Sequence, residues 1–321
     1  MHTLVFDRRD ISLEYENSCL IIREPNTPPR TLPLSHISKV MCLHSVQLTT
    51  SLLGQLWQRG IDFVVLNSRY SERSLGLYPH QQHQVERRCV QYRWQQDTAI
   101  CLTLAIELCR HRIRHFIRLL PPGNTHLCHC MEQFRSTMQL CQNLEELRGA
   151  EGAAQRMIFD YWRNQLPANL GFHKRQRRPP PDPVNALLSL TYTLVMQEAI
   201  RQCTAAALDS QLGFYHRTAF GRHSLACDIM EPVRPAVESQ VMNWFISGLF
   251  NLRHFTPPDT RAGACMLGKA GREIFYRAVG PCMNDWQRQL KATARWISRN
   301  IELSRTGDHH DPNPLLAPDS I

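Results

Sequence analysis

The chain has 321 residues, 43% of them hydrophobic, which is enough for two domains with separate cores and excludes disorder as its default state. Its 37 Lys and Arg residues exceed its 28 Asp and Glu residues, and the net charge of +9 favours phosphate-rich partners through sequence-independent electrostatics. The sequence shows neither a secretory signal nor an apolar stretch of membrane-spanning length, so we expect a soluble, cytoplasmic protein without a membrane partner.

Residues 1–80 predict a small β-rich domain. Apolar and β-branched runs at 19–23, 38–42 and 62–66 are separated by turn-rich pieces, which is the pattern of short strands. One helix interrupts them, with apolar residues at helical spacing from Leu52 to Trp57 and Gly60 as a stop signal. No titratable cluster in this region resembles a catalytic site.

The pattern then changes to long helices, with residues 81–88 as the expected linker. Residues 90–120 carry apolar residues on one face and arginines on the other. We expect further helices at about 131–146, 149–165, from 183 onward, from 224 onward with a kink at Pro232 and Pro235, and at about 282–303. The expected class is therefore α+β, a small N-terminal β-rich domain followed by a larger all-helical catalytic domain at 89–304. Residues 305–321 predict a polar, disordered tail.

Twelve cysteines are present, mostly scattered, and we expect most of them to be reduced, buried and apolar in character. The cluster His126, Cys128, His129 and Cys130 contains metal-ligand residue types at the start of a predicted helix. No second ligand pair follows at zinc-finger spacing, so local surface or packing roles are favoured over zinc binding.

A basic, proline-rich segment, HKRQRRPPPDP at 173–183, interrupts the helices. Its four cations are Lys174, Arg175, Arg177 and Arg178. An isolated basic run of this kind is typical of a solvated loop. Asp182 followed by Pro183 predicts a helix start, with Asp as the N-cap and Pro in the first turn.

Glu151 is the first acidic residue that can take part in chemistry. It aligns at helical spacing with Ala154, Ile158 and Trp162, so its carboxylate emerges at the margin of an apolar face. A glutamate in a first helical turn is also favoured by the helix dipole, which is the simpler interpretation when Glu151 is considered alone.

His216, Asp228 and Glu231 follow later in the chain. An isolated loop histidine between aromatic residues is more often hydrogen-bonded than metal-bound. Asp228 and Glu231 are three residues apart, so on a helix they share a face and can approach one cation. The same spacing fits a capping box with Asp228 as the N-cap, although apolar periodicity from Leu225 argues against a helix start there.

Taken together, these residues offer two or three carboxylates and one imidazole, a donor set that suits Mg²⁺ or Mn²⁺. Such a site can polarise a phosphodiester for in-line displacement. The sequence contains no G-x-S-x-G elbow, phosphate loop or H-E-x-x-H motif, so the nucleophile is expected to be water or a DNA 3′-hydroxyl. Arg222, Arg234 and the basic run at 174–178 can position phosphates beside the metal.

Four segments resemble the CRISPR-associated protein one family, the integrase subunit of spacer acquisition. They are GAEGAAQRMIFDYW, RRPPPDPVNALLSLTYTLV, LDSQLGFYHRTAFGRHSLACDIMEPVRPAVES and CMLGKAGREIF, and they occur in family order across residues 149–276. The β-then-helical layout extends the agreement to nearly the whole chain. The N-terminal half matches by layout rather than by a sharp motif.

The resemblance implies that Glu151, His216 and Glu231 bind the divalent metal, with Asp228 as an adjacent acidic residue. It makes Asn185 a supporting polar group of the site, which we also count among the DNA-binding residues, and Arg234 a phosphate contact. It further implies a prokaryotic homodimer, with residues 1–80 serving dimerisation and DNA contact, bridged by a small CRISPR-associated protein two partner. The implied substrates are double-stranded prespacer DNA and the CRISPR repeat, joined by attack of prespacer 3′-hydroxyls.

Two other functions remain open from the residues. The same metal site can serve an endonuclease that uses water as the nucleophile, because the ligand set does not select between water and a DNA hydroxyl. A non-catalytic, basic DNA-binding scaffold is the third interpretation, in which the acidic residues are helix caps.

Overall fold

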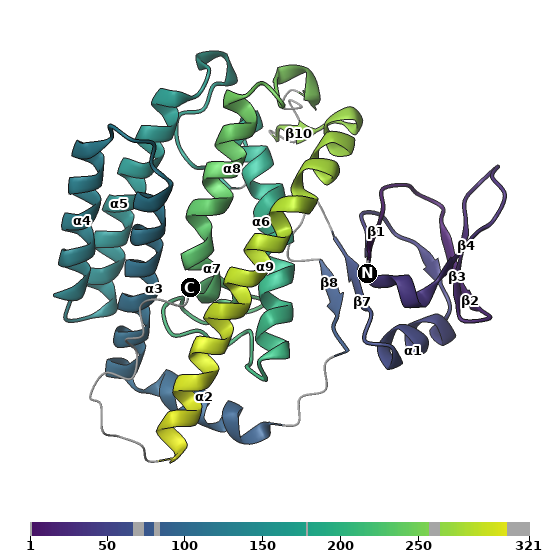
Figure 1. Cartoon of the computed structure of the whole chain (residues 1–321), viewed down its shortest axis with the longest axis horizontal. Helices are drawn as coiled ribbons and strands as arrows, with labels where there is room; N and C mark the ends of the chain where they lie inside the picture. The colour runs from purple at the N-terminus through teal and green to yellow at the C-terminus, as the bar shows by residue number, and fades with distance from the viewer. Residues whose placement is uncertain (1, 67–73, 80–83, 178, 257–263, 307–321) are drawn as a thin grey trace. The chain divides into compact units, whose positions relative to one another are not determined.

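The computed structural model describes residues 2–66, 74–79, 84–177, 179–256 and 264–306. The chain divides into two compact units, Met1–His83 and Gln84–Ile321 (Figure 1). The first unit is rich in strands and the second is mostly helical, which confirms the predicted class. No helix among the described residues is long and apolar enough to cross a membrane.

The first unit contains two four-stranded sheets and one α-helix. One sheet has the order β1 (His2–Phe6), β5 (Ile37–Cys42), β7 (Asp62–Val65) and β8 (Leu75–Leu77), of which the first three are parallel and β8 is antiparallel. The other has the order β4 (Arg30–Pro33), β3 (Cys19–Arg23), β2 (Ser12–Glu16) and β6 (Gln47–Leu48). The predicted strands near 19–23, 38–42 and 62–66 are confirmed.

Helix α1 (Thr50–Gln58) contributes the remaining core of this unit. Thr49 caps it, because its side chain accepts a hydrogen bond from the Leu52 N–H. Leu52 and Leu56 are fully buried in a cluster with Leu13, Leu20, Val40 and Phe63 from the two sheets. The apolar spacing in the sequence therefore predicts the correct buried face.

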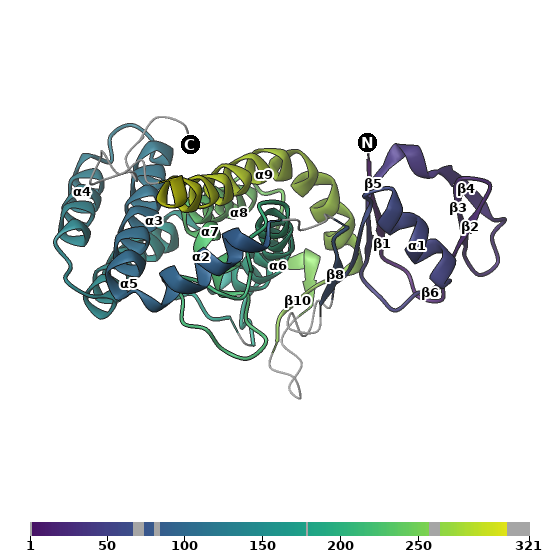
Figure 2. The same ribbon diagram turned by 90° about the horizontal axis from the view of Figure 1, so that it is seen from below.

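The second unit is built from eight α-helices in its described part. They are α2 (Val85–Gln96), α3 (Thr98–Leu119), α4 (Thr125–Gln139), α5 (Leu144–Gln165), α6 (Pro183–Ala205), α7 (Ser224–Met230), α8 (Arg234–Ile246) and α9 (Lys269–Thr306). Helices α3, α4 and α5 lie side by side, and α6 to α9 form a second group (Figures 1 and 2). In the described residues of this unit, a short ladder of β9 (Phe255–Thr256) and β10 (Met266–Leu267) departs from the predicted all-helical structure.

The predicted helix over 90–120 is two helices that meet at Asp97. The backbone of Asp97 is extended, and its carboxylate accepts hydrogen bonds from Ala99 N and Ile100 N at 2.9 and 3.1 Å. An aspartate that caps the following turn starts a new helix there, which the apolar periodicity alone conceals. Helix α2 begins at Val85, so residues 85–88 of the predicted linker are helical.

Three predicted helix boundaries also shift. Helix α4 begins earlier than expected, at Thr125, and α5 begins at Leu144, where Asn143 accepts from the N–H groups of Glu145 and Glu146. Helix α9 begins at Lys269 and continues through Pro281, although the prediction begins after that proline. Phe275, Val279, Trp286 and Leu290 are buried on both sides of Pro281, and this packing keeps the helix continuous.

Candidate active site

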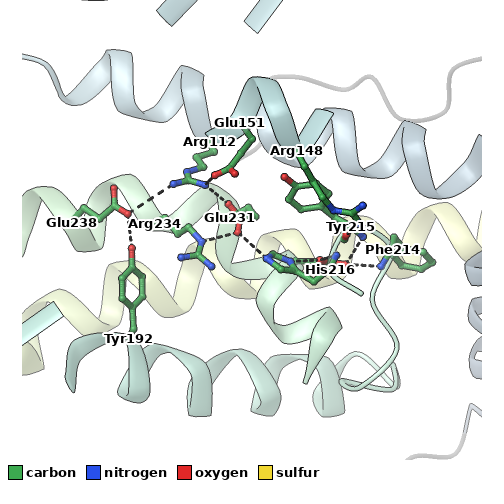
Figure 3. Close-up of polar contacts among 11 residues, drawn as sticks. Arg112, Arg148, Glu151, Tyr192, Phe214, Tyr215, His216, Glu231, Arg234 and Glu238 are labelled. Carbon is green, nitrogen blue, oxygen red and sulfur yellow. Dashed lines mark hydrogen bonds and ion pairs between the residues drawn. The ribbon is translucent and has the colours of Figure 1, made fainter. Parts of the chain in front are cut away.

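Glu231 lies where two helices meet. Pro232 follows it, and residues Glu231–Val233 form a 3-10 turn (η4) between α7 and α8, as the prolines predict. The turn buries the Glu231 side chain, which is 2% exposed. Its Oε1 accepts a hydrogen bond from Arg234 Nε, and its Oε2 accepts one from Arg112 Nη1, each at 2.7 Å (Figure 3).

The surroundings of Glu231 keep it ionised. Burial by itself raises the pKa of this carboxyl group, but Arg234, Arg112 and His216 outweigh it and lower the pKa to about 2. Burial by itself lowers the pKa of Arg112 and of Arg234. The charge of Glu231 is the largest effect in the opposite direction, and the pKa of both arginines is raised. Glu231 is therefore a carboxylate at neutral pH.

His216 and Asp228 form a hydrogen-bonded pair beside Glu231. His216 Nδ1 lies 2.7 Å from Asp228 Oδ1, and the backbone N–H groups of Phe214, Tyr215 and His216 also donate to Asp228. Because a carboxylate only accepts, Nδ1 donates to Asp228, while Nε2 lies 3.6 Å from Glu231 Oε1. Asp228 lies inside α7, so its interpretation as a helix N-cap is wrong.

Gly213 makes this arrangement possible. A Cβ atom at this position would meet the Ser224 backbone carbon at 2.7 Å and Asp228 Oδ2 at 2.8 Å. The loop that carries His216 can therefore approach Asp228 only with glycine at position 213.

Glu151 reaches the same cluster from α5. Its carboxylate accepts a short hydrogen bond from Arg112 Nη1, the nitrogen that also donates to Glu231 (Figure 3). The Glu151 side chain is 22% exposed and lines the cleft described below, so it is accessible from solvent. The structure thus brings Glu151, His216 and Glu231 to one place from three separate elements.

Glu238 adds a further carboxylate that we did not predict. It lies two turns after Glu231 on α8, is 2% exposed, and its Oε1 accepts from the Tyr192 hydroxyl at 2.5 Å. Arg112 Nη2 is 3.9 Å from the same oxygen. Glu238 Oε2 is buried without a hydrogen-bond partner.

Arg112 was also missed. Our prediction places the arginines of this helix opposite the apolar stripe, but Arg112 lies within the stripe, one turn after Leu108 and one turn before Phe116, and is buried. That position is the available sequence signal, because a buried arginine needs carboxylate partners. Glu231 and Glu238 are seven residues apart, a spacing that places two side chains on one face of a helix. This spacing is a weaker sequence signal that Glu238 belongs to the same site.

A cleft of about 1110 Å³ opens over this cluster. Its lining carries ten Arg and Lys residues against five Asp and Glu residues, so its electrostatic character is that of a phosphate-binding surface. Five of the predicted DNA-contacting residues line it: Lys174, Arg175, Arg177, Arg222 and Arg234. Arg178 lies outside the described residues.

Asn185 does not reach this cleft as a direct contact, which corrects its assignment as a DNA-binding residue. It is fully buried at the start of α6, where Asp182 accepts from its N–H at 2.8 Å. Its side chain instead accepts from Arg175 Nη1 and Gln176 N and donates to the Lys174 carbonyl. Asn185 therefore holds the basic loop against α6.

The cysteine-rich region shows no assembled metal site. Cys130 Sγ is 3.7 Å from His126 Nε2 on the first turns of α4, and His129 contacts Gln133 rather than a cysteine. All twelve cysteines are free, and six of them are buried, fewer than the majority we predicted.

The donor atoms near Glu231 nevertheless suit a hard divalent cation. Carboxylate oxygens with one imidazole nitrogen are typical ligands of Mg²⁺ and Mn²⁺, and one nitrogen of Arg112 already contacts the carboxylates of both Glu151 and Glu231. In the described ranges, no three Asp, Glu, His or Cys side chains form a ready-made metal-binding group. The residues fit a metal ion if Arg112 leaves its present position.

Comparison with known proteins identifies the family. A family model described as CRISPR associated protein Cas1 matches residues 4–280. The chain is 30% identical over 306 residues to CRISPR-associated endonuclease Cas1 1 of Thermodesulfovibrio yellowstonii. The aligned region covers 92% of this chain and 94% of that protein. It is also 30% identical over 275 residues to CRISPR-associated endonuclease Cas1 3 of Thermus thermophilus, covering 85% and 81% of the two chains.

Solved structures share the fold. A casposase bound to integration product matches with a TM-score of 0.82 at 17% identity, covering 100% of this chain and 94% of that one. A Cas1 protein from Thermotoga maritima matches with a TM-score of 0.80 at 18% identity, covering 94% and 97%. Since the family model spans most of the sequence and full-length relatives share nearly a third of its residues, the chain belongs to the Cas1 family of CRISPR-associated proteins.

Proposed function

We propose that this chain is a metal-dependent DNA integrase of CRISPR adaptation. The observation that supports it is that Glu151, His216 and Glu231 lie together on the wall of a cleft lined mainly by Arg and Lys among its charged residues. We assign these three residues as ligands of Mg²⁺ or Mn²⁺. When bound, such a cation polarises the scissile phosphodiester and stabilises the oxygens that enter and leave.

The other residues of the cleft orient the ligands and the DNA. Asp228 fixes the His216 ring so that Nε2 faces the cleft. Arg234, Arg222 and the basic loop supply positive charge along the cleft, where they can bind the phosphates flanking the reacting bond.

The attacking group in this proposal comes from the DNA. The described lining of the cleft contains no Ser, Thr or Cys side chain. Its two tyrosines are poor nucleophiles, because the Tyr192 hydroxyl donates to Glu238 and burial raises the pKa of Tyr215. A prespacer 3′-hydroxyl then loses its proton and forms a new P–O bond, while the repeat strand's O3′–P bond breaks and leaves a 3′-hydroxyl. The number of phosphodiester bonds is unchanged, so no external energy source is needed.

The test is a joining assay with the purified chain, its small partner, Mn²⁺, a 3′-hydroxyl DNA duplex and a repeat-containing plasmid. Glu151→Ala and Glu231→Gln should abolish joining, while Arg288→Ala on the exposed part of α9 should leave it intact. Joining that persists in Glu151→Ala would overturn the assignment of the site.

Blocking the 3′ ends of the DNA separates integration from simple hydrolysis. We expect joining to stop with blocked ends, whereas an endonuclease that uses water would still cut the plasmid. If Glu151→Gln and Glu231→Gln alter the stability of the protein but leave its metal-dependent activity unaltered, the protein is instead a DNA-binding scaffold.

We also propose that the chain acts as a homodimer bridged by a small CRISPR-associated protein two partner. One structural match, at a TM-score of 0.77 and 21% identity, is a Cas6-RT-Cas1–Cas2 complex, in which a Cas1-containing protein is assembled with Cas2. Size-exclusion chromatography with light scattering, with and without the partner, measures the stoichiometry directly.

A further inference from the structure

Arg112 occupies the position that the proposed metal ion needs, and the inference below rests on the proposed function. Its Nη1 donates to both Glu151 and Glu231, the two carboxylates assigned as metal ligands (Figure 3). Its side chain is 4% exposed, and its Nε is buried without a hydrogen-bond partner. A guanidinium and a divalent cation held against the same oxygens repel each other, because both are positive and a buried site screens their charges weakly.

The buried carboxylates explain why a cation must be present even without metal. Glu231 and Glu238 are each 2% exposed, and an ionised group in such a place is strongly unfavourable unless it is paired. Arg112 and Arg234 supply the compensating charge in the metal-free protein, and of the two only Arg112 also contacts Glu151.

Glu238 offers Arg112 a second position. Arg112 Nη2 is 3.9 Å from Glu238 Oε1, which is too long for a hydrogen bond. Glu238 Oε2 is buried and accepts no hydrogen bond. A small movement of the guanidinium away from Glu151 and Glu231 would give Glu238 two parallel hydrogen bonds, the geometry that arginine and carboxylate prefer.

We propose that Arg112 is an exchangeable internal cation that holds Glu151 and Glu231 before metal binding and moves to Glu238 when the metal binds. Arg112 and Glu238 are thus positioning residues rather than ligands. The exchange leaves each buried carboxylate beside a cation in both states and sets the affinity of the protein for the metal.

The test measures Mn²⁺ binding to the full chain by isothermal titration calorimetry, without DNA. Arg112→Met removes the competing cation, so we expect Mn²⁺ affinity to rise about tenfold or more, together with a lower melting temperature in the absence of metal that Mn²⁺ restores. Glu238→Gln removes the second position, so Mn²⁺ affinity should fall roughly threefold to tenfold.

The double variant distinguishes the exchange from a simple effect of charge. In the Arg112→Met background, Glu238→Gln should change Mn²⁺ affinity by less than about twofold, because the two residues act through each other. An equal loss in both backgrounds would overturn the role of Glu238. Weaker Mn²⁺ binding in Arg112→Met would overturn the exchange, since Arg112 would then organise the ligands rather than compete with the metal.

Two further variants keep the result interpretable. Arg110→Met on the same helix, where Arg110 pairs with Glu107 at 2.8 Å, should leave Mn²⁺ affinity unchanged. If Arg112→Met does not fold, Arg112→Gln replaces it, because its neutral amide can still hydrogen-bond to the carboxylates but carries no competing charge, and it should also tighten Mn²⁺ binding. Glu231→Gln tests the site itself: wild-type protein that binds Mn²⁺ no better than this variant contradicts the proposed function rather than the exchange.

Discussion

Asp228 shows how one side chain can organise a site without facing the reaction. It accepts hydrogen bonds from the N–H groups of Phe214, Tyr215 and His216 and from His216 Nδ1. These contacts fix both the loop and the ring, so that His216 presents Nε2 to the cleft. Such supporting partners of a metal-binding histidine set its tautomer and its orientation.

We therefore predict that Asp228→Asn weakens both the fold and the site. The amide replaces one acceptor oxygen with a donor that faces other donors, and we expect a loss of about 1–3 kcal/mol of stability with a roughly 10–100-fold loss of Mn²⁺ affinity. Thermal melting and calorimetry measure the two effects. Asp209→Asn, whose carboxylate accepts from Tyr92 outside the cleft, is the matched control, and unchanged Mn²⁺ binding in Asp228→Asn would refute the positioning role.

A second prediction concerns Gly213. Because an added Cβ would overlap the Ser224 backbone and Asp228, we expect Gly213→Ala to lower Mn²⁺ affinity and to destabilise the protein by about 1–3 kcal/mol. Gly149→Ala on α5, where a Cβ would meet nothing within 4 Å, should instead be neutral or stabilising by about 0.5–1 kcal/mol. Equal effects of the two changes would show that the close approach at Gly213 is unimportant.

At the scale of elements, the active site depends on how α3 packs against η4. Arg112 and His115 lie one turn apart on the side of α3 that meets this turn, and His115 Nδ1 is 2.7 Å from the Pro232 carbonyl. This face of α3 therefore contacts Pro232 through His115 and pairs the Glu231 carboxylate with the guanidinium of Arg112. Disturbing α3 should therefore affect both stability and the metal site.

His115 makes this packing sensitive to pH. Burial lowers the pKa of its imidazole, with only partial opposition from the Pro232 carbonyl. Neutral His115 thus contributes stability that is fully present above its unfolded pKa of about 6.5 and is lost as pH falls from there through the lower folded pKa. We predict that the melting temperature decreases between pH 7 and pH 5 and that His115→Gln reduces this decrease, whereas the exposed His129→Gln does not.

At the scale of the whole molecule, the excess of positive charge is concentrated where it can act on DNA. The cleft lining is twice as rich in basic as in acidic residues, while the Glu231 carboxylate is held ionised among them. In the proposed function the basic residues attract DNA phosphates, and the carboxylates of Glu151 and Glu231 attract the metal cation. Binding of the DNA backbone should therefore depend strongly on salt.

We predict a linear fall in the logarithm of DNA affinity with the logarithm of salt concentration, measured by fluorescence anisotropy. Arg177→Ala should reduce the slope by about one, the value for one lost phosphate contact, without changing sequence preference. Arg288 pairs with Asp285 on α9 and does not line the cleft, so Arg288→Ala should keep the wild-type slope. A wild-type slope in Arg177→Ala would show that this arginine does not contact phosphate.

Local sequence determines much of this protein. Strand runs such as Cys19–Arg23, the cap at Asp182 and the proline-marked junction at Glu231 were predictable because each depends on residues close together in the chain. The ordered motifs around Glu151, His216 and Glu231 also indicated the family and these three residues. Helix boundaries at Asp97 and Pro281 were less predictable, because capping and packing compete there with periodicity.

Tertiary structure alone decides how the charges are paired. Arg112 is 39 residues from Glu151 and 119 from Glu231 along the chain, and no local pattern brings its guanidinium between them. Asp228 and Asn185 likewise acquired their partners through packing, which makes Asp228 the partner of His216 rather than a cap and turns an expected DNA contact at Asn185 into a buried loop anchor. Sequence supplies the ionisable groups, but burial and the distances between them, which depend on the assembled helices, determine which charges must neutralise each other.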